Sequence, residues 1–448
     1  MQFFIKFFIS LVFILGFIFF MVSHYDNKNN HYVGSDTCQG CHADYYQAWK
    51  HQTLHPRIFR PVETDEDIQG DFSQPNPVVT FKKDEIEFVI GNKWEQVYVR
   101  IIEGEYYPFP AKWLITTQKW AAFKVDTWHK TPMSTQCNGC HTTGFNPDTY
   151  EFVEFGVGCE ACHGAGNLHS KHRQQQQGLC VACHHNTPIK QEDIVVSVKS
   201  SICGQCHSRG NQKKLDKDNL QVSFGFPVDY QVGEEISKNY QMVSAVPNKN
   251  TQHWWGLGLS KNRHQEFADF SVSKHGQSLQ RLKENHDNSQ GELVDECLEC
   301  HSADYIFAKN DKPSLTTAKE GITCVVCHEP HGLDRQFPSL NRGVHSCGSC
   351  HAQTLVAKAA KIGKPHIPNL HQNVSCVDCH MPYIIESGGA YPIRSHAFKI
   401  VPPIASKQFD MPNSCQNGGC HANKSVDWAI QVFDDYYPLF GKRLINAH

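Results

Sequence analysis

The first segment of the chain is long, apolar and almost free of charge. Phe7–Val22 contains no charged side chain, Lys6 is the only charge before it, and the polar stretch Ser23–Asn30 follows. Roughly 20 apolar residues can span a bilayer, and no small-x-small cleavage site is evident at the end of the run. We therefore predict an uncleaved N-terminal membrane helix over residues 1–23, with a cleaved signal peptide as the alternative.

Two later segments have patterns that differ from the rest of the chain. Within 43–136, short runs rich in Val, Ile, Tyr and Phe are separated by turn residues, which is typical of β-strands. The segment 208–296 is predicted to be mostly loop, followed by a helix around Phe270–Asn285. Residues 43–136 are therefore predicted to form a small β-sheet, with strands at Pro77–Lys83, Glu85–Gly91, Gln96–Glu103 and Trp113–Thr117.

Cysteine and histidine carry the strongest chemical signal. The 448 residues include 20 Cys and 28 His. Nine cysteine pairs read C-x-x-C-H and a tenth reads C-x-x-x-x-C-H, so no cysteine is left over. In chain order, motifs one to ten are Cys38/Cys41/His42, Cys137/Cys140/His141, Cys159/Cys162/His163, Cys180/Cys183/His184, Cys203/Cys206/His207, Cys297/Cys300/His301, Cys324/Cys327/His328, Cys347/Cys350/His351, Cys376/Cys379/His380 and Cys415/Cys420/His421.

C-x-x-C-H is the attachment signature of c-type haem. The two thiols form thioethers with the vinyl groups on one edge of the porphyrin, and the adjacent histidine ligates the iron. A zinc site usually joins two separate C-x-x-C units or one unit with a spaced histidine pair, and a disulfide scaffold needs no histidine. We therefore predict about ten covalently attached heme c (haem c) groups. A local disulfide is the alternative for the wider tenth pair.

This prediction changes how the composition is interpreted. A formal net charge of -3 argues against a strongly basic nucleic-acid binder. Ten porphyrins are large apolar plates that would form most of the core. The predicted fold class is a multihaem cytochrome c, mainly α and coil built around ten covalent haems, with a small β-rich insertion and an N-terminal membrane helix.

The motif histidines divide the chain into one isolated haem, a cluster of four and a cluster of five. The predicted organisation is a transmembrane anchor (1–23), a first haem module (31–60), the β-rich insertion (61–136), a four-haem cluster (137–210), a loop and helix connector (211–296), a five-haem cluster (297–425) and a C-terminal tail (426–448).

Eighteen histidines lie outside the motifs, enough to provide a second axial ligand for every iron. Haem iron held by two strong axial ligands is low-spin and closed, which suits electron transfer rather than substrate binding. We expect His24, His31 and His448 to be exposed. The predicted distal ligands are His51 or His55, His169 or His172, His185, His275, His331, His366 or His371, and His396.

Several stretches together carry a family resemblance. They are Tyr32–His42 with Trp49 and His51–His55 after it, Gly158–Gly164 followed by His169, GITCVVCHEPHG at 321–332, and CVDCHMP at 376–382 followed by His396 and Pro412–Trp428. These stretches resemble the periplasmic multihaem c-type cytochromes, in particular the cytochrome c-552/4 type, and GITCVVCHEPHG also resembles the decahaem electron conduits. The resemblance implies either a passive electron carrier or an enzyme acting on nitrite, hydroxylamine or tetrathionate, since one fold serves both.

We expect an electron-transfer protein rather than a catalyst, and assign no catalytic residue. Covalent haem attachment occurs outside the cytoplasmic membrane. The haem domain is therefore expected in the periplasm, tethered to the inner (cytoplasmic) membrane. Electrons would pass between the quinol pool and a redox partner, which would be a quinol-linked membrane protein or a periplasmic or outer-membrane cytochrome.

The alternative is a reductase of a small nitrogen or sulfur oxyanion with one open haem. Such a site needs cationic or hydrogen-bonding groups beside the iron, and Arg57, Arg60, Tyr391 and Arg394 lie near motifs. The CHMP stretch resembles the pentahaem nitrite reductases. Their lysine-bearing C-x-x-C-K motif is absent here, which weakens this alternative.

Overall fold

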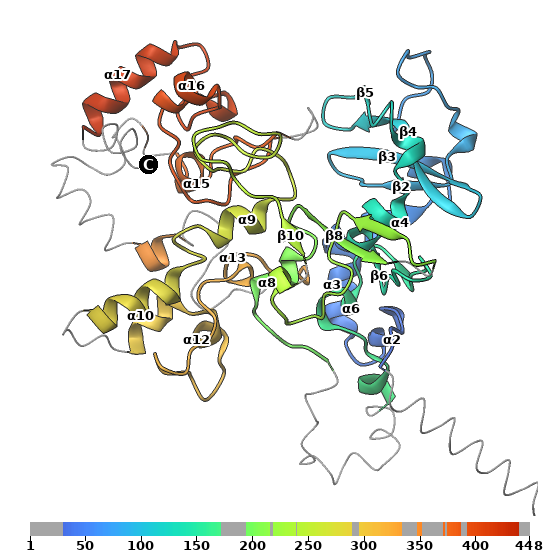
Figure 1. The fold of residues 1–448 in the computed structure, drawn as a ribbon, viewed down its shortest axis with the longest axis horizontal. Coiled ribbons are helices and arrows are strands. Elements are labelled where there is room, and N and C mark those ends of the chain that lie inside the picture. The colour runs from blue at the N-terminus through green and yellow to red at the C-terminus, as the bar shows by residue number, and fades with distance from the viewer. Residues whose placement is uncertain are drawn as a thin grey trace, which may run out of the picture.

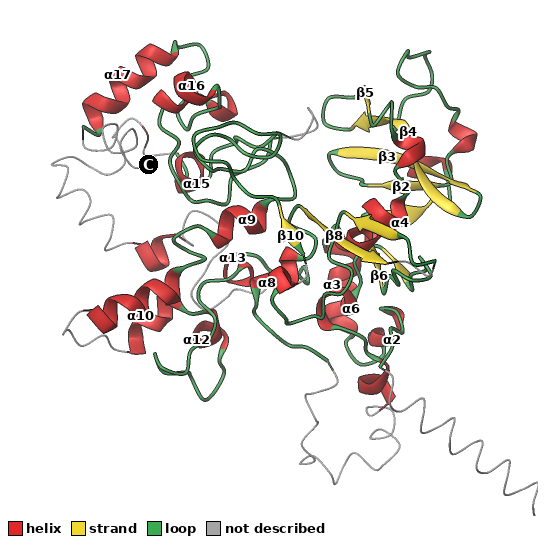
Figure 2. Cartoon of the chain, viewed as in Figure 1, coloured by secondary structure: helices red, strands yellow, loops and turns green. Residues whose placement is uncertain are grey.

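The computed structural model describes residues 30–171, 194–215, 218–238, 240–288, 295–333, 347–351, 371, 374–386 and 392–438. Short helices and three antiparallel sheets are joined by long loops (Figures 1 and 2). The predicted anchor at 1–23 lies outside the described residues, and no helix within them is long and apolar enough to cross a membrane. The helices are α2 Asp36–Gln39, α3 Ala43–Gln52, α4 Met133–Gln136, α5 Asn138–His141, α6 Cys159–His163, α8 Ser200–Gly204, α9 Glu266–Ser271, α10 Ser278–Asn288, α11 Leu298–His301, α12 Ala303–Phe307, α13 Cys324–Cys327, α15 Cys376–His380, α16 Ile404–Phe409 and α17 Val426–Tyr436.

The β-rich insertion forms a five-stranded antiparallel sheet in the order β1-β2-β3-β4-β5. In its longest pair, β3 with β4, the predicted strand Gln96–Glu103 is confirmed as β3, whereas most of β4 was not predicted; most side chains of the pair are buried. The strands are β1 Phe59–Pro61, β2 Phe88–Ile90, β3 Glu95–Ile102, β4 Glu105–Leu114 and β5 Lys119–Ala122.

Two of the predicted strands are wrong. Pro77–Lys83 contains no strand, because Asn76 accepts hydrogen bonds from the amides of Val78 (3.1 Å) and Val79 (3.0 Å) and so closes a turn there. The strand predicted at Trp113–Thr117 is instead the end of β4, and the chain turns at residues 115–118 before β5. The left-handed backbone of Gln118 (φ 50°) closes this turn.

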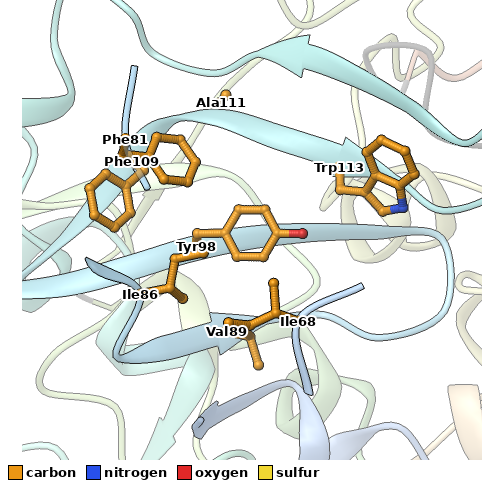
Figure 3. Close-up of a cluster of buried hydrophobic side chains, with 8 residues drawn as sticks. All are labelled: Ile68, Phe81, Ile86, Val89, Tyr98, Phe109, Ala111 and Trp113. Atoms are coloured by element: carbon orange, nitrogen blue, oxygen red, sulfur yellow. The ribbon is translucent and has the colours of Figure 1, made fainter. Parts of the chain in front are cut away.

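The insertion has an aromatic core of its own (Figure 3). Tyr98 lies at the centre of the cluster and is fully buried. The rings of Phe81 and Phe109 stack with centroids 4.1 Å apart, and Phe81 comes from the loop before β2. The sheet therefore has a protein core that contains no C-x-x-C-H motif.

The segment predicted to be a loop contains a second sheet of three strands, in the order β10-β8-β9. The strands are β8 Gly210–Leu215, β9 Gln221–Phe224 and β10 Gln241–Met242. The sequence of β8 is mostly polar and shows no strand pattern. It is held by long-range bonds instead, since Gln212 donates to Asp229 (2.7 Å) and accepts from the Val228 amide (3.0 Å). A two-stranded ladder, β6 Thr142–Thr143 with β7 Glu154–Phe155, adds to β content that the predicted fold class did not include.

The single helix predicted around Phe270–Asn285 is two helices, α9 and α10, separated by a tight turn. A β-carbon at Gly276 would lie 2.3 Å from the Phe270 carbonyl oxygen, so the turn requires glycine there. As a result His275 lies in a turn rather than on a helix. Leu279 and Leu282 of α10 pack against Leu298.

The connector also packs against the C-terminal part of the chain. The indole of Trp255 donates to the Ile384 carbonyl (2.9 Å), and both residues are buried in a cluster with Val401. In Figure 1 the five-stranded sheet and the helices α16 and α17 lie on opposite sides of the view, with α8 and α13 between them. Segments far apart in sequence are thus joined around the motif helices.

The aromatic core predicts a large effect of truncation within the sheet. Replacing Phe109 by Ala removes the ring stacked on Phe81, and loss of a buried Phe side chain costs about 3–5 kcal/mol. We expect Phe109→Ala to lower the free energy of unfolding of the sheet by that amount in denaturant titrations. Ile101→Ala, at a position that is 37% exposed, is the control and is expected to change it by about 0.5 kcal/mol or less. Equal effects of the two changes would contradict the assigned core.

Candidate haem-binding sites

The C-x-x-C-H motifs form single helical turns. The amide of the motif histidine donates to the carbonyl of the first cysteine at His42 (2.9 Å), His141 (3.1 Å), His207 (2.9 Å) and His328 (2.9 Å). Residues three and four apart in a helix lie on the same face. Each turn therefore presents two thiols and one imidazole on one side, the arrangement that the two thioethers and the iron bond of one haem require.

Motif ten reaches a related arrangement through two extra residues. Gly418 (φ 63°) and Gly419 (φ 84°) both have left-handed backbone, which only glycine adopts readily. These two glycines let the backbone turn within Asn417–Gly419, between Cys415 and Cys420. Cys415 and Cys420 form no disulfide in this structure, and their assignment to a tenth haem stays a prediction.

The described cysteines fit covalent haem attachment. None of the 18 forms a disulfide, and none is fully buried. The protein core is divided into four small hydrophobic clusters, and of the described motif cysteines only Cys137 and Cys297 pack against one of these.

Three of the predicted haem-binding thiols lie on the surface, although a porphyrin core predicts that motif thiols are covered. Cys41 of motif one, Cys327 of motif seven and Cys420 of motif ten are exposed, whereas the other described motif cysteines are half-buried. Cys41 is exposed because it lies at the end of the short turn that follows α2, where few protein side chains pack. An accessible thiol can still form a thioether, so the assignment of Cys41 to haem one stays a prediction.

One complete motif cannot be compared with the prediction. Cys180, Cys183 and His184, the predicted attachment and ligand residues of motif four, all lie outside the described residues. Their assignment to haem four rests on the C-x-x-C-H spacing alone.

Several motif histidines face a second imidazole. Two imidazole nitrogens, each about 2 Å from a shared metal, leave their ring centroids about 6 Å apart. The nearly parallel pairs are His42 with His169 (6.3 Å) and His163 with His331 (6.1 Å). The tilted or perpendicular pairs are His328 with His396 (6.3 Å), His351 with His275 (5.8 Å) and His421 with His371 (5.8 Å).

The remaining predicted distal histidines have different positions. His55 is close enough to His207 to affect its charge, whereas His51 is exposed on α3. His31 is exposed, as expected. His172, His185 and His366 lie outside the described residues, as do His24 and His448.

Burial keeps many of these imidazoles neutral. It lowers the pKa of His55, His141 and His275 to about 4, with a neighbouring histidine adding to the effect at His55 and His275. Burial also lowers the pKa of His163 and His328. A histidine must be neutral to bind a metal, so these side chains are ready to act as ligands at neutral pH.

The imidazoles differ in the partner of their Nδ1 atom, the ring nitrogen that would not bind the iron. The Nδ1 atom of His163 is 2.7 Å from the Val195 carbonyl oxygen, which is a neutral partner. The Nδ1 atom of His207 is 3.5 Å from the Glu266 carboxylate. Burial acts to lower the pKa of His207, but the nearby carboxylate of Glu266 raises it overall.

Motifs that are distant in sequence touch one another. The thiols of four cysteine pairs lie close enough to shift one another's pKa: Cys38 with Cys159, Cys203 with Cys324, Cys300 with Cys350, and Cys347 with Cys376. Motifs two and five are joined twice, because Cys140 approaches the Gln205 carbonyl (3.7 Å) and Cys206 approaches the Gly139 carbonyl (4.0 Å).

The arginines near the motifs are engaged by the protein. Arg394 donates to the carbonyls of Val377 and Met381 and pairs with Asp378 (2.6 Å), which braces α15. Arg60 pairs with Asp67 (3.3 Å) and Arg57 bonds backbone carbonyls. The fourth candidate, Tyr391, lies outside the described residues.

One buried histidine was not identified from the sequence. His264 lies between the connector strands and α9, with left-handed backbone (φ 62°) and a pKa lowered to about 3 by burial and by Arg263. It belongs to no motif, and nothing in its immediate sequence marks it. A buried histidine beside Glu266 and His207 is a further candidate ligand.

Comparisons with known proteins agree with this geometry. The family model described as cytochrome c554 and c-prime matches residues 114–164 and 260–329, and the model of a doubled CXXCH motif matches residues 316–355. The crystal structure of the outer cell wall cytochrome OcwA is 30% identical, covers 92% of this chain and 88% of its own, and superposes with a TM-score of 0.74. The chain belongs to the multihaem c-type cytochromes.

The family resemblance seen in the sequence is thus confirmed, and haem c is the cofactor of this cytochrome. An undecahaem cytochrome from the S-layer of Carboxydothermus ferrireducens has the same fold, with 21% identity, a TM-score of 0.50, and coverage of 91% of this chain and 60% of its own. No curated protein matches the chain in sequence.

The imidazole pairs predict that, of two proposed distal histidines, His169 binds an iron and His51 does not. We expect His169→Ala to convert one haem from low-spin to high-spin, because His169 is the ring stacked opposite His42. His51→Ala, at an exposed position of α3, is the matched control and is expected to leave the spin state unchanged. Low-temperature electron paramagnetic resonance of the oxidised protein measures both. A high-spin signal from the His51 variant alone would reverse the assignment.

Proposed function

We propose that this protein is a decahaem cytochrome that transfers electrons along an ordered series of haems. The close approach of motifs that are far apart in sequence is the observation that carries the proposal. Haem c, when bound, supplies the one-electron chemistry. The chain's own residues set the spacing of the haems and provide their axial imidazoles.

The contacts support a particular order. Motif one touches motif three through Cys38 and Cys159. Motif three touches motif five, since the Gln205 side chain donates to the Ala161 carbonyl (2.8 Å). Motif five touches motif seven through Cys203 and Cys324.

The series continues through the C-terminal motifs. The pKa of Cys327 in motif seven is raised by burial and by Cys347 of motif eight, and Cys347 also raises the pKa of Cys376 in motif nine, so the three thiols are neighbours. The Ser414 hydroxyl, beside motif ten, donates to the Cys379 carbonyl (2.9 Å). The proposed trunk is therefore one, three, five, seven, eight, nine, ten. Motif two branches from five, and motif six branches from eight.

The imidazole pairs support the same order. His169, which faces His42 of motif one, follows motif three in the chain. His331, which faces His163 of motif three, follows motif seven, and His396, which faces His328 of motif seven, follows motif nine. We propose these three, with His275, His371 and His55, as distal ligands. Each would tie its own haem to the segment of another motif.

We further propose that the haem domain lies outside the cytoplasmic membrane, tethered by residues 1–23. Electrons would enter from the quinol pool and leave to a periplasmic or outer-membrane cytochrome. The basis is the apolar N-terminal run and the covalent haem chemistry. The name of OcwA places that relative at the outer cell wall, so a position at the cell surface is the alternative.

Fractionation tests the location. We expect the full-length protein to remain in the membrane pellet after alkaline carbonate extraction and a variant lacking residues 1–23 to be released. Release of both forms would contradict the anchor. Degradation of the haem domain by protease added to intact cells would favour the surface over the periplasm.

A second candidate function is a reductase at motif two. Among the described residues, His141 makes no ring contact with another imidazole, and its buried Nδ1 atom has no hydrogen-bond partner. An iron without a second strong ligand can bind substrate. A high-spin signal from one haem that shifts on addition of nitrite, hydroxylamine or tetrathionate would support this function, and its absence would exclude an open haem.

The proposed order predicts different effects of removing a trunk haem and a branch haem. Cys324→Ser with Cys327→Ser removes haem seven and should divide the reduced haems into two pools, because the trunk is interrupted. Cys137→Ser with Cys140→Ser removes haem two and should leave one pool. Stopped-flow reoxidation by a bulky oxidant is expected to be biphasic for the first variant and monophasic for the second. Mass spectrometry should show that each variant lacks about one haem. Monophasic kinetics in both would contradict the order.

A further inference from the structure

Two glutamates contact imidazoles from the side opposite the expected iron. The carboxylate of Glu266 lies 3.5 Å from Nδ1 of His207, the motif-five histidine. The carboxylate of Glu329 lies 3.0 Å from Nδ1 of His331, the imidazole facing motif three. Both side chains are largely withdrawn from water, with 20% and 4% of their surface exposed.

The backbone holds each carboxylate in place. Glu329 accepts hydrogen bonds from the amides of His331 (3.2 Å) and Leu333 (2.8 Å). Glu266 opens α9, and the next amide, Phe267, donates to the His207 carbonyl (3.0 Å). Glu329 therefore lies on the same short segment of backbone as His331, whereas Glu266 reaches His207 from α9, which a backbone hydrogen bond joins to motif five.

Five other described imidazoles have a neutral partner or none at this nitrogen. His163 contacts the Val195 carbonyl and His396 contacts the Arg394 carbonyl (3.2 Å). The Nδ1 atoms of His141, His275 and His301 are buried without a hydrogen-bond partner. A carboxylate at Nδ1 therefore distinguishes His207 and His331 from these five.

A carboxylate that accepts the Nδ1 proton of an axial histidine makes the imidazole a stronger electron donor, and Glu329 is within hydrogen-bond distance of His331 (3.0 Å). The Glu266 oxygen near His207 is buried without a hydrogen-bond partner, so at 3.5 Å it acts by its charge. A stronger donor and a nearby negative charge both stabilise ferric over ferrous iron, so the reduction potential falls. We propose that Glu266 and Glu329 are positioning residues that lower the potentials of haems five and three. These haems are neighbours in the proposed order, through the bond from Gln205 to Ala161.

The inference rests on the proposed function, because it requires His207 and His331 to be axial ligands. It assigns an energetic role to haems three and five in the proposed order. A low-potential pair between motifs one and seven stays oxidised until the haems on either side have been reduced. The centre would then act as an energetic step between two groups of haems rather than as a storage site.

Redox potentiometry of the full, haem-loaded protein tests the proposal. Glu266→Gln and Glu329→Gln should each move one haem's share of the absorbance change from the low-potential end to higher potential. The expected shift is about tenfold in the ferrous-to-ferric ratio of that haem at fixed potential, about 59 mV for a one-electron couple. The low-spin resonance signal of the same haem should change its g-values, since the donor strength of one ligand changes.

Glu154→Gln is the matched control. Glu154 is a half-buried carboxylate near motifs one and three, but it bonds the Ser35 amide (3.0 Å) and hydroxyl (2.8 Å) rather than an imidazole. Because Glu154 contacts no imidazole, Glu154→Gln should leave the g-values of the low-spin signals unchanged and shift the titration less than either test variant. Titrations of both test variants that overlay the wild type at full haem content would overturn the proposal, as would an equal shift in the control.

Aspartate variants cover the case in which a glutamine variant loses its haem. Glu266→Asp and Glu329→Asp keep the charge but withdraw it by one methylene group, so a smaller shift in the same direction is expected. No shift at full haem content would again overturn the inference. A wrong haem order would appear in the reoxidation kinetics of the trunk variant and would leave these titrations unchanged, so the two failures are distinguishable.

Discussion

The structure depends on one local constraint: two thiols and an imidazole must share one side of a single helical turn. The hydrogen bond from the motif histidine to the first cysteine closes that turn, and it needs only five consecutive residues. Helices in this chain can therefore be very short, such as α5 and α13 with four residues each. Isolated helices of this length are not stable in water, so the bound cofactor and its neighbours must stabilise them.

The long-range contacts extend this constraint across the chain. Imidazoles that follow one motif face the histidine of another, as His169 does for motif one and His331 for motif three. Metal binding of this kind couples ligand binding to folding, because the paired ligands meet only in the folded chain. The hydrophobic clusters between the motifs are small and separate, which is the distribution expected when porphyrins supply much of the apolar core.

The five-stranded sheet follows a different principle, because its own aromatic side chains bury one another. It is joined to the haem region by charge. Glu95 on β3 pairs with Lys112 on β4 (2.6 Å) and with Arg263, one residue before His264. Burial of such a pair is costly unless both charges are satisfied, and here one carboxylate serves two cations. The sheet thereby contacts the segment that carries Glu266, the carboxylate beside His207.

The sequence by itself determined the cofactor, the motif residues and a short set of ligand candidates, because these depend on spacing within five residues or on residue type. It also indicated β3 and the end of β4, whose strand-forming residues are a local pattern. The tertiary structure decided which imidazole faces which motif, since His169, His331 and His396 each cross from another part of the chain. It also decided β8, a polar strand held by Gln212 and Asp229, and the placement of Glu266 behind His207. Those contacts join residues far apart in sequence, and no local pattern encodes such a meeting.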